Sequence, residues 1–346
     1  MMRERNENIL RVRDLRTYFH TDQGAARAVD GVSFDLPAGK TLALVGESGC
    51  GKSVTALSIL RLVPCPPGRI ESGEVWLEDR NLLALPESAM RKIRGNDISM
   101  IFQEPMTSMN PVFRVGNQIA AAIRVHRKMS KEAARREAVA LLEQVGIPAP
   151  ESRVDDYPHQ MSGGMLQRIM IAMALACNPK VLIADEPSTA LDVTIQAQIL
   201  DLLKNLQRQR GMSVLLITHD LGVVAEVADE VVVMYAGQKV EQAPVATLFA
   251  RPQHPYTVGL FASLPSLNAG SDRLYTIQGA VPSATDFPGG CRFHPRCPYA
   301  MPVCADHEPG FDPVGEEHRA ACWLHNAEVM RAQGRQTGLP EEAPRP

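Results

Sequence analysis

The chain has 346 residues, of which 45% are hydrophobic, 22% are charged and 5% are aromatic, with a formal net charge of -3. This composition is that of a globular protein, and it excludes collagen-like, fibrous and wholly disordered classes. The small net charge gives no global electrostatic reason to expect nucleic acid or an anionic membrane as the main partner. The length fits one large or two ordinary domains.

The N-terminal segment and the apolar runs bear on how the chain could meet a membrane. Residues 1–8 are polar and charged and lack the apolar core of a secretory signal, so we do not expect export. Apolar runs such as residues 169–177 have about half of the ~20 residues that a membrane-spanning helix needs. A role at a membrane therefore requires a partner that spans it.

Short apolar runs alternate with helical patterns along the first 265 residues. The runs are rich in β-branched residues, which predicts buried strands, and their alternation with helices predicts an α/β domain with a largely parallel sheet. The predicted strands are residues 41–45, 98–102, 181–184 and 214–218.

Two helices can be read between these strands. One starts at the N-cap Ser130, places Val139, Leu142 and Val145 on one face, and stops at Gly146. Another helix follows Asp192, and its apolar residues recur at the spacing of one helix face, which we expect to face the core. These apolar residues are Ile195, Ile199, Leu202 and Leu206.

The composition changes after about residue 265. Proline and glycine become frequent, and four of the seven cysteines lie between Cys291 and Cys322. We predict a first domain over residues 1–265, a small loop-rich domain over residues 266–330 and a solvated tail over residues 331–346.

A phosphate-binding pattern follows the first predicted strand. Residues 46–53 read Gly-Glu-Ser-Gly-Cys-Gly-Lys-Ser and fit G-x-x-x-x-G-K-[ST]. The glycines let consecutive amides converge on phosphate oxygens, Lys52 supplies charge to the β- and γ-phosphates, and Ser53 ligates Mg²⁺. The Cys50 amide is expected to matter, and its thiol is an oxidisable alternative. The expected nucleotide contacts are Gly46, Ser48, Gly49, Cys50, Gly51, Lys52 and Ser53.

Two further motifs follow in order. The strand 181–184 ends in Asp185 and Glu186, which suit a Mg²⁺ ligand and a general base for an attacking water. Ser162, Gly163 and Gly164 precede an apolar helix and form a second anion-binding end. Two phosphate sites in one chain favour a dimer.

Three more features follow in order: Gln103 after strand 98–102, the loop 188–192 that ends at Asp192, and His219 after strand 214–218. With these motifs, the sequence resembles the ATP-binding cassette (ABC) family. The resemblance implies an α/β, ABC-type P-loop nucleotide-binding fold with a RecA-like core, an antiparallel β subdomain and an α-helical subdomain at about residues 104–165.

The resemblance also implies roles for single residues. Gln103 senses Mg²⁺ and the attacking water, Asp192 links the two active sites of a dimer, and His219 contacts the γ-phosphate. The Ser162-Gly163-Gly164 segment closes over the nucleotide that the opposite subunit holds. Where the family commonly has L-S-G-G-Q, this chain has methionine at the first and last positions, so the contribution of the missing glutamine is open.

An aromatic residue near the N-terminus stacks on adenine in this family. Its spacing after Leu15 indicates Phe19, with Tyr18 as the alternative and an ordinary core aromatic as the plainer interpretation. Stacking contributes only about 1 kcal/mol, so the sequence constrains this position weakly.

More narrowly, the chain resembles the ATPase subunits of dipeptide and oligopeptide importers over nearly its whole length. The resemblance implies that the segment just after Gln103 docks on a permease, with an ordinary surface loop as the alternative. His159 is interpreted as structural. The residues that carry the resemblance are 102–111, 157–160, 197–199, His254-Pro255-Tyr256-Thr257 and Pro295-Arg296-Cys297-Pro298-Tyr299.

The implied function is ATP-driven peptide uptake at the cytoplasmic face of the inner membrane, with ATP and Mg²⁺. The implied partners are two transmembrane permeases, a second, related but different ATPase subunit, and an extracytoplasmic peptide-binding protein, with no nucleic acid. Nickel complexes or other small solutes are alternative cargoes. A soluble, non-transport ABC ATPase that acts on a macromolecule is the contrasting hypothesis.

Cys291, Cys297, Cys304 and Cys322 lie in a region with few apolar residues. Disulfides do not suit a reducing compartment, and structural zinc usually shows C-x2-4-C pairs, which these spacings lack. A [4Fe-4S] cluster suits four loop cysteines, with the charges of Arg292, Arg296 and Arg319 to offset its own. Members of the dipeptide-importer branch carry such a cluster, so we expect it here, with zinc as the alternative.

Overall fold

The computed structural model describes residues 7–103, 109–187, 192–263 and 276–339, which divide between two compact units. The first unit comprises Met1–Leu10, Leu36–Thr41 and Trp76–Ile217. The second comprises Arg11–Asp35, Leu42–Val75 and Thr218–Pro346. The N-terminal strands and the region around residue 42 therefore contribute to both.

Three parallel strands form the sheet of the first unit. They are β6 (Ile98–Ile101), β7 (Val181–Asp185) and β8 (Ser213–Ile217), with β7 between the other two. Every residue of β7 and β8 is buried, as expected for parallel strands covered on both faces. The predicted strands 98–102, 181–184 and 214–218 are confirmed to within one residue at each end.

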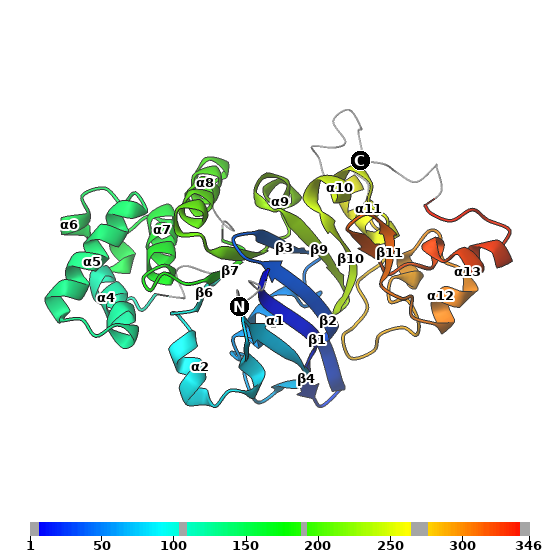
Figure 1. Cartoon of the computed structure of the whole chain (residues 1–346), viewed down its shortest axis with the longest axis horizontal. Coiled ribbons are helices and arrows are strands. Elements are labelled where there is room, and N and C mark those ends of the chain that lie inside the picture. The colour runs from blue at the N-terminus through cyan, green and yellow to red at the C-terminus, as the bar shows by residue number, and fades with distance from the viewer. Residues whose placement is uncertain (1–6, 104–108, 188–191, 264–275, 340–346) are drawn as a thin grey trace, which may run out of the picture. The chain divides into compact units, whose positions relative to one another are not determined.

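Helices of the first unit follow the predicted caps. Ser130 accepts a hydrogen bond from the Ala133 amide, and Asp192 accepts one from the Ile195 amide. These bonds satisfy amides that a helix start leaves without partners. The group α4 to α7 lies together in Figure 1. The helices are α2 (Glu87–Ile93), α4 (Val115–His126), α5 (Lys131–Gln144), α6 (Pro150–Arg153), α7 (Gly163–Ala174) and α8 (Val193–Arg210), with short 3-10 turns at Leu82–Ala84 and Pro158–Gln160.

The buried faces of α5 and α8 differ in detail from the prediction. In α5 the fully buried side chains include Ala138 and Leu142, whereas Val139 is only half-buried. In α8 they include Ile199 and Leu203, whereas Leu202 is half-buried. In α5, alanine is small enough to face the core at close approach, so a pattern read from large residues alone missed Ala138. In α8 the predicted Leu202 is displaced by its neighbour Leu203.

The sheet of the second unit extends from the strand before residues 46–53, the phosphate-binding loop, to the C-terminal region. Strand β3 (Thr41–Val45) runs parallel to β9 (Glu230–Tyr235), which pairs antiparallel with β10 (Gln238–Pro244). Next to β10 lies β12 (His318–Ala320), which pairs with β11 (Asp312–Gly315). The segment after residue 310 therefore adds two strands to the edge of this sheet.

The second sheet is built from the N-terminal strands. Its order is β2 (Gly24–Pro37), β1 (Asn8–Thr21), β4 (Gly68–Leu77), and β5 (Arg80–Asn81) pairs with the last residues of β4. The helices of the second unit are α1 (Lys52–Ile59), α9 (Leu221–Val227), α10 (Val245–Ala250), α11 (Pro255–Ala262), α12 (Pro302–Asp306) and α13 (Ala327–Ala332), with 3-10 turns at His294–Arg296 and Trp323–His325.

One hydrophobic core joins β3 and β9 to the cysteine-containing region. Tyr235, Tyr256 and Phe293 are buried together, with ring centroids 4.7 to 5.5 Å apart. Since the 291–297 segment packs on this core, its position is coupled to the strand that leads into the nucleotide loop. In the described part of the chain, no helix is long and apolar enough to cross a membrane.

Candidate nucleotide site and cysteine cavity

The loop between β3 and α1 needs glycine at two positions. Gly46 and Gly51 have φ angles of 147° and 103°, which side chains rarely adopt. A Cβ atom on Gly46 would lie 2.2 Å from the Met234 carbonyl oxygen, and one on Gly51 would lie 2.2 Å from the Ala28 oxygen. The backbone of this loop is therefore packed against β2 and β9.

The start of α1 offers amides to an anion. Its N-cap is Gly51, which has no side chain that could bond them, and amides at a helix start are groups that an anion can bind. Lys52 is 6% exposed, and its ammonium donates to the carbonyl oxygens of Gly46 and Glu47 at 2.7 and 3.1 Å. Cys50 is fully buried, and burial raises the pKa of its thiol. This favours a backbone role for Cys50, since oxidation requires the thiolate.

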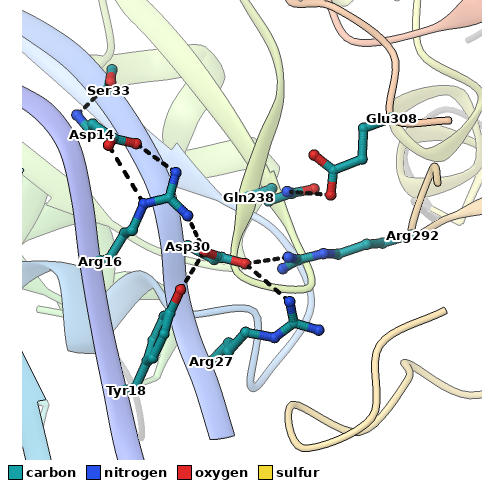
Figure 2. A network of polar contacts seen from close by, with 9 residues as sticks. All are labelled: Asp14, Arg16, Tyr18, Arg27, Asp30, Ser33, Gln238, Arg292 and Glu308. Atoms are coloured by element: carbon teal, nitrogen blue, oxygen red, sulfur yellow. Dashed lines mark hydrogen bonds and ion pairs between the residues drawn. The ribbon is translucent and has the colours of Figure 1, made fainter. Parts of the chain in front are cut away.

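Strand alternation distinguishes Phe19 from Tyr18. Thr17 lies 2.7 Å from Ser58 of α1, oxygen to oxygen, so its face of β1 is turned toward that helix. Phe19 is two residues further and shares this face. Tyr18 is on the other face, where its hydroxyl donates to Asp30 at 2.7 Å (Figure 2). Phe19 and Tyr18 therefore lie on opposite faces of β1, and Phe19 shares the face that is turned toward α1.

His219 follows β8 and is exposed. The amide of Thr218, its neighbour, donates to the Leu44 carbonyl of β3 at 3.3 Å, and Asp220 caps α9. His219 is thus anchored on both sides, next to the strand that leads to the phosphate-binding loop.

Gln103 and Glu186 lie together in the first unit. The amide nitrogen of Gln103 donates to Glu186 Oε2 at 2.9 Å. Asp185 is 4% exposed at the end of β7, and Glu186 has a φ of 48°, a strained value for a residue with a side chain. Such strain is often kept where a side chain must be aimed. The predicted water-sensing and base residues are therefore in contact.

The Ser162-Gly163-Gly164 segment starts α7 as predicted. Ser162 is the N-cap, and its hydroxyl accepts from the Met165 amide at 3.3 Å. A Cβ on Gly164 would lie 3.0 Å from Ile195 of α8, which explains the small residue. The buried Gln167 donates to the Pro187 carbonyl and ties α7 to the residue after Glu186.

Some predicted features lie outside the described residues. They are Ser188–Leu191 of the loop that ends at Asp192, and residues 104–108 of the segment predicted to dock on a permease. Asp192 itself caps α8. His159 stacks on Tyr157 with ring centroids 5.6 Å apart, which fits a structural role.

All four C-terminal cysteines line one small, largely enclosed cavity. His254, Tyr299 and Trp323 complete much of its wall. Burial raises the pKa of Cys291 to about 11 and that of Cys297 to about 12. Among the described residues, no three His, Cys, Asp or Glu side chains form a group that could hold a metal ion.

Arg292 and Arg296 do not direct their charges at this cavity, so that expectation was wrong. Arg292 pairs with Asp30 and donates to the Ala236 carbonyl at 2.6 Å. Arg296 forms two bonds to the Glu47 carboxylate, at 2.7 and 3.0 Å. Each arginine thus pairs with a carboxylate, Asp30 or Glu47. A hydrogen bond between two charged groups is stronger than the interaction of an arginine with a neutral thiol.

Comparison with known proteins extends this picture. Residues 29–189 match the family model "ABC transporter", and residues 240–304 match "Oligopeptide/dipeptide transporter, C-terminal region". A Sinorhizobium fredii protein, "Probable peptide ABC transporter ATP-binding protein y4tR", is 54% identical over 93% of this chain and 96% of its own. The chain belongs to the ATP-binding subunits of peptide ABC transporters.

Two Bacillus subtilis relatives are 52% identical. The "Oligopeptide transport ATP-binding protein AppD" matches over 92% of this chain and 98% of its own, and the "Dipeptide transport ATP-binding protein DppD" over 94% and 97%. Among solved structures, the dimeric post-hydrolysis cassette MJ0796 bound to ADP and phosphate has a TM-score of 0.62 and 26% identity, over 68% of this chain and 98% of that one. The predicted ABC-type P-loop fold and an ATPase activity coupled to transport are thereby confirmed.

Sequence reasoning missed the surroundings of Glu47. Its amide donates to the hydroxyl of the buried Tyr256 at 2.8 Å, and its carboxylate pairs with Arg296. One indication was available: a carboxylate within a phosphate-binding loop needs a cation to offset it. The sequence did not show which cation, because the two residues are 249 positions apart.

Proposed function

We propose that this subunit energises the uptake of dipeptides or oligopeptides through partner permeases. The observation that carries the proposal is the identity of 52 to 54% to peptide-transport subunits over more than nine-tenths of the chain. The match to the oligopeptide/dipeptide C-terminal region over residues 240–304 supports it further.

The proposed chemistry is in-line attack of water on the γ-phosphate of ATP. Glu186 accepts a proton from the water, and Gln103, its hydrogen-bond partner, orients both. Lys52 and His219 stabilise the charge that develops on the transferred phosphoryl group. The backbone amides of the loop hold the phosphates, and Phe19 stacks on adenine. The loop residues assigned to phosphate binding are Gly46, Ser48, Gly49, Gly51 and Ser53.

Mg²⁺ suits the proposed donors, because a hydroxyl, a carboxylate and an amide oxygen are the hard oxygen ligands it prefers. Ser53, Asp185 and Gln103 would supply them. When bound, the ion offsets the negative charge of the β- and γ-phosphates.

The proposed assembly contains two cassettes, in which Ser162, Gly163 and Gly164 of one subunit close over the nucleotide of the other and Asp192 joins the two sites. The second cassette is a related but different chain. Two transmembrane permeases hold the pair at the cytoplasmic face of the membrane, and an extracytoplasmic binding protein delivers the peptide to them. The exposed Val112 and Phe113, 70% and 54% exposed, follow the segment assigned to permease docking and support this arrangement.

Transport by the reconstituted complex tests the proposal. Proteoliposomes that hold this subunit, its companion cassette and the permeases encoded beside them should take up a labelled dipeptide when ATP and the binding protein are supplied. The same complex with Glu186→Gln should not. Uptake of nickel but no peptide would replace peptide with a metal complex as cargo, and uptake of neither would argue against an importer.

We propose in addition that the four cysteines hold a [4Fe-4S] cluster. The supporting observation is that Cys291, Cys297, Cys304 and Cys322 line the same enclosed cavity. Four thiolates are the usual ligand set for such a cluster. When bound, the cluster would join the 291–297 segment to α12, which contains Cys304, and to Cys322.

Metal analysis of protein purified without oxygen tests this second proposal. About four iron and four acid-labile sulfide per chain, lost in Cys297→Ser, are expected for such a cluster. About one zinc and no sulfide would establish a structural zinc site instead. Absence of all three would leave the cavity as a group of ordinary buried thiols and would refute the proposal.

A further inference from the structure

The C-terminal motifs meet the phosphate-binding loop at one residue, Glu47. Tyr256 comes from the His254-Pro255-Tyr256-Thr257 motif, and Arg296 comes from the motif that contains Cys297. Tyr256 accepts the Glu47 amide hydrogen bond at 2.8 Å, and Arg296 binds both carboxylate oxygens. Both motifs lack a role in the ATPase chemistry described above.

The contact is built rather than incidental. The Arg296 side chain is 5% exposed, and Tyr256 is fully buried. The guanidinium group lies 5.7 Å from the centre of the Tyr235 ring and 5.9 Å from that of Phe293, both of which belong to the buried core. Arg296 therefore has one well-defined position, whereas an arginine on an open surface samples many.

Glu47 poses an electrostatic problem that Arg296 solves. A carboxylate in a loop that cradles phosphates repels the triphosphate, and this repulsion weakens binding unless a cation offsets it. The bidentate ion pair with Arg296 offsets the negative charge of Glu47 and also holds the Glu47 side chain in one position. The pair thus affects both the charge and the shape of the loop.

A second arginine of the same segment is linked to the loop through one turn. Arg292 donates to the carbonyl of Ala236, and the amide of the next residue, Gly237, donates to the Cys50 carbonyl at 3.1 Å. The 291–297 segment is therefore in contact with the loop directly at Glu47 and through one turn at Cys50.

We propose that Arg296 and Tyr256 are positioning residues for the phosphate-binding loop, and that neutralisation of Glu47 by Arg296 sets the affinity of this subunit for ATP. The cysteine-containing region is then a part of the nucleotide site rather than an appendage to it. The proposal rests on the assignment of residues 46–53 as the phosphate-binding loop, and does not depend on what the cysteines hold.

Charge rescue tests the proposal in the full-length protein. Arg296→Gln is expected to raise the Kd for ATP about five- to tenfold at low salt, with a smaller change in kcat, because it leaves the Glu47 charge near the phosphates. The double variant Glu47→Gln/Arg296→Gln should return the Kd to within about twofold of wild type, since no charge is then uncompensated. Equilibrium binding of ATP and steady-state kinetics measure both.

Three further variants complete the experiment. Tyr256→Phe, which removes only the hydroxyl, should raise the Kd about two- to threefold. Arg69→Gln removes an exposed arginine of β4 and should change nothing. Lys52→Ala should abolish ATP binding.

The outcomes are distinct. A wild-type Kd in Arg296→Gln, or a double variant as weak as Arg296→Gln, would overturn the proposal. ATP binding that survives in Lys52→Ala would instead overturn the loop assignment. If Arg296→Gln does not fold, Arg296→Met takes its place, because it removes the charge and keeps an unbranched apolar side chain in the buried position. A rise of at least about twofold that Glu47→Gln removes would support the proposal, and a wild-type Kd would overturn it.

Discussion

Asp30 on β2 and Arg292 beside Cys291 form an ion pair in which the two side chains are only 5% and 4% exposed. Tyr18 and Arg16 also bond to Asp30, at 2.7 and 2.8 Å (Figure 2). Burial alone would raise the pKa of Asp30, but hydrogen bonds from Arg292 and Tyr18 outweigh it, and the pKa lies below its usual value. The N-terminal sheet is thus fastened to the cysteine-containing segment by charge.

The first prediction concerns this pair. Asp30→Asn should lower the free energy of unfolding by about 3 kcal/mol, because it leaves the Arg292 charge buried with no counter-ion. Asp155→Asn is the matched control, since Asp155 is 41% exposed and pairs with Arg135 at the surface. That change should cost less than about 1 kcal/mol. Urea unfolding measures both, and equal costs for the two variants would contradict the assignment of Asp30 as a buried anchor.

The second prediction concerns the base and its partner. Glu186→Gln should lower ATP turnover about 10²- to 10⁴-fold, because an amide cannot accept the proton from water. The amide oxygen can still accept the hydrogen bond from Gln103, so ATP binding and ATP-driven dimerisation should persist. Phosphate release and size-exclusion chromatography measure the two effects. Unchanged turnover would remove Glu186 from its role as the base.

The third prediction separates the two aromatic residues of β1. Phe19→Ala should raise the KM for ATP about fivefold, since a lost stacking contact is worth about 1 kcal/mol. Tyr18→Phe keeps a ring and loses only the hydroxyl that donates to Asp30, so KM should stay within about twofold of wild type. If instead Tyr18→Ala, and not Phe19→Ala, raises KM, the stacking residue is on the opposite face of the strand.

The four predicted strands could be read from the sequence because each is a largely apolar run, whereas strands with mixed polar residues, such as β1 and β10, were not predicted. Residues 41–45 form β3 with the predicted bounds, and all five are buried. Parallel strands with both faces covered carry this pattern in any context. Helix existence was predictable from caps such as Ser130 for the same local reason. Helix faces were less so, because Ala138 occupies a core position that a larger residue was expected to fill.

The candidate site was predictable where its residues form local motifs and unpredictable where distant segments meet. The loop 46–53 carries its chemistry in eight consecutive residues. By contrast, Arg292 and Arg296 were assigned to the cysteines because they are their neighbours in sequence. The structure pairs them with Asp30 and Glu47, which are 262 and 249 positions away. Only tertiary packing brings such pairs together, and no local pattern encodes it.

The last prediction concerns Lys239 on β10. Its ammonium donates to Gln242 at 2.7 Å and lies 4.0 Å from the centre of the Phe311 ring. Burial lowers the pKa of Lys239 to about 8; Glu230 and Asp35 oppose this effect, whereas Arg319 and Arg13 add to it. The folded chain therefore releases this proton at a lower pH than the unfolded chain, in which the lysine has its ordinary pKa of 10.5.

The sign of the pH dependence follows from that difference. Between pH 8 and pH 10.5 the unfolded chain binds more protons, so the contribution of Lys239 to the free energy of unfolding rises with pH. The gain is at most about 1.4 kcal/mol per pH unit. Lys239→Met lacks this contribution, so the wild type should gain stability relative to the variant as the pH is raised from 8 to 10.

Lys180→Met, which removes a lysine that is 46% exposed, is the control and should show no such trend. Urea unfolding at several pH values gives the difference directly. A constant difference between wild type and Lys239→Met across this range would mean that the lysine keeps its proton in the folded protein.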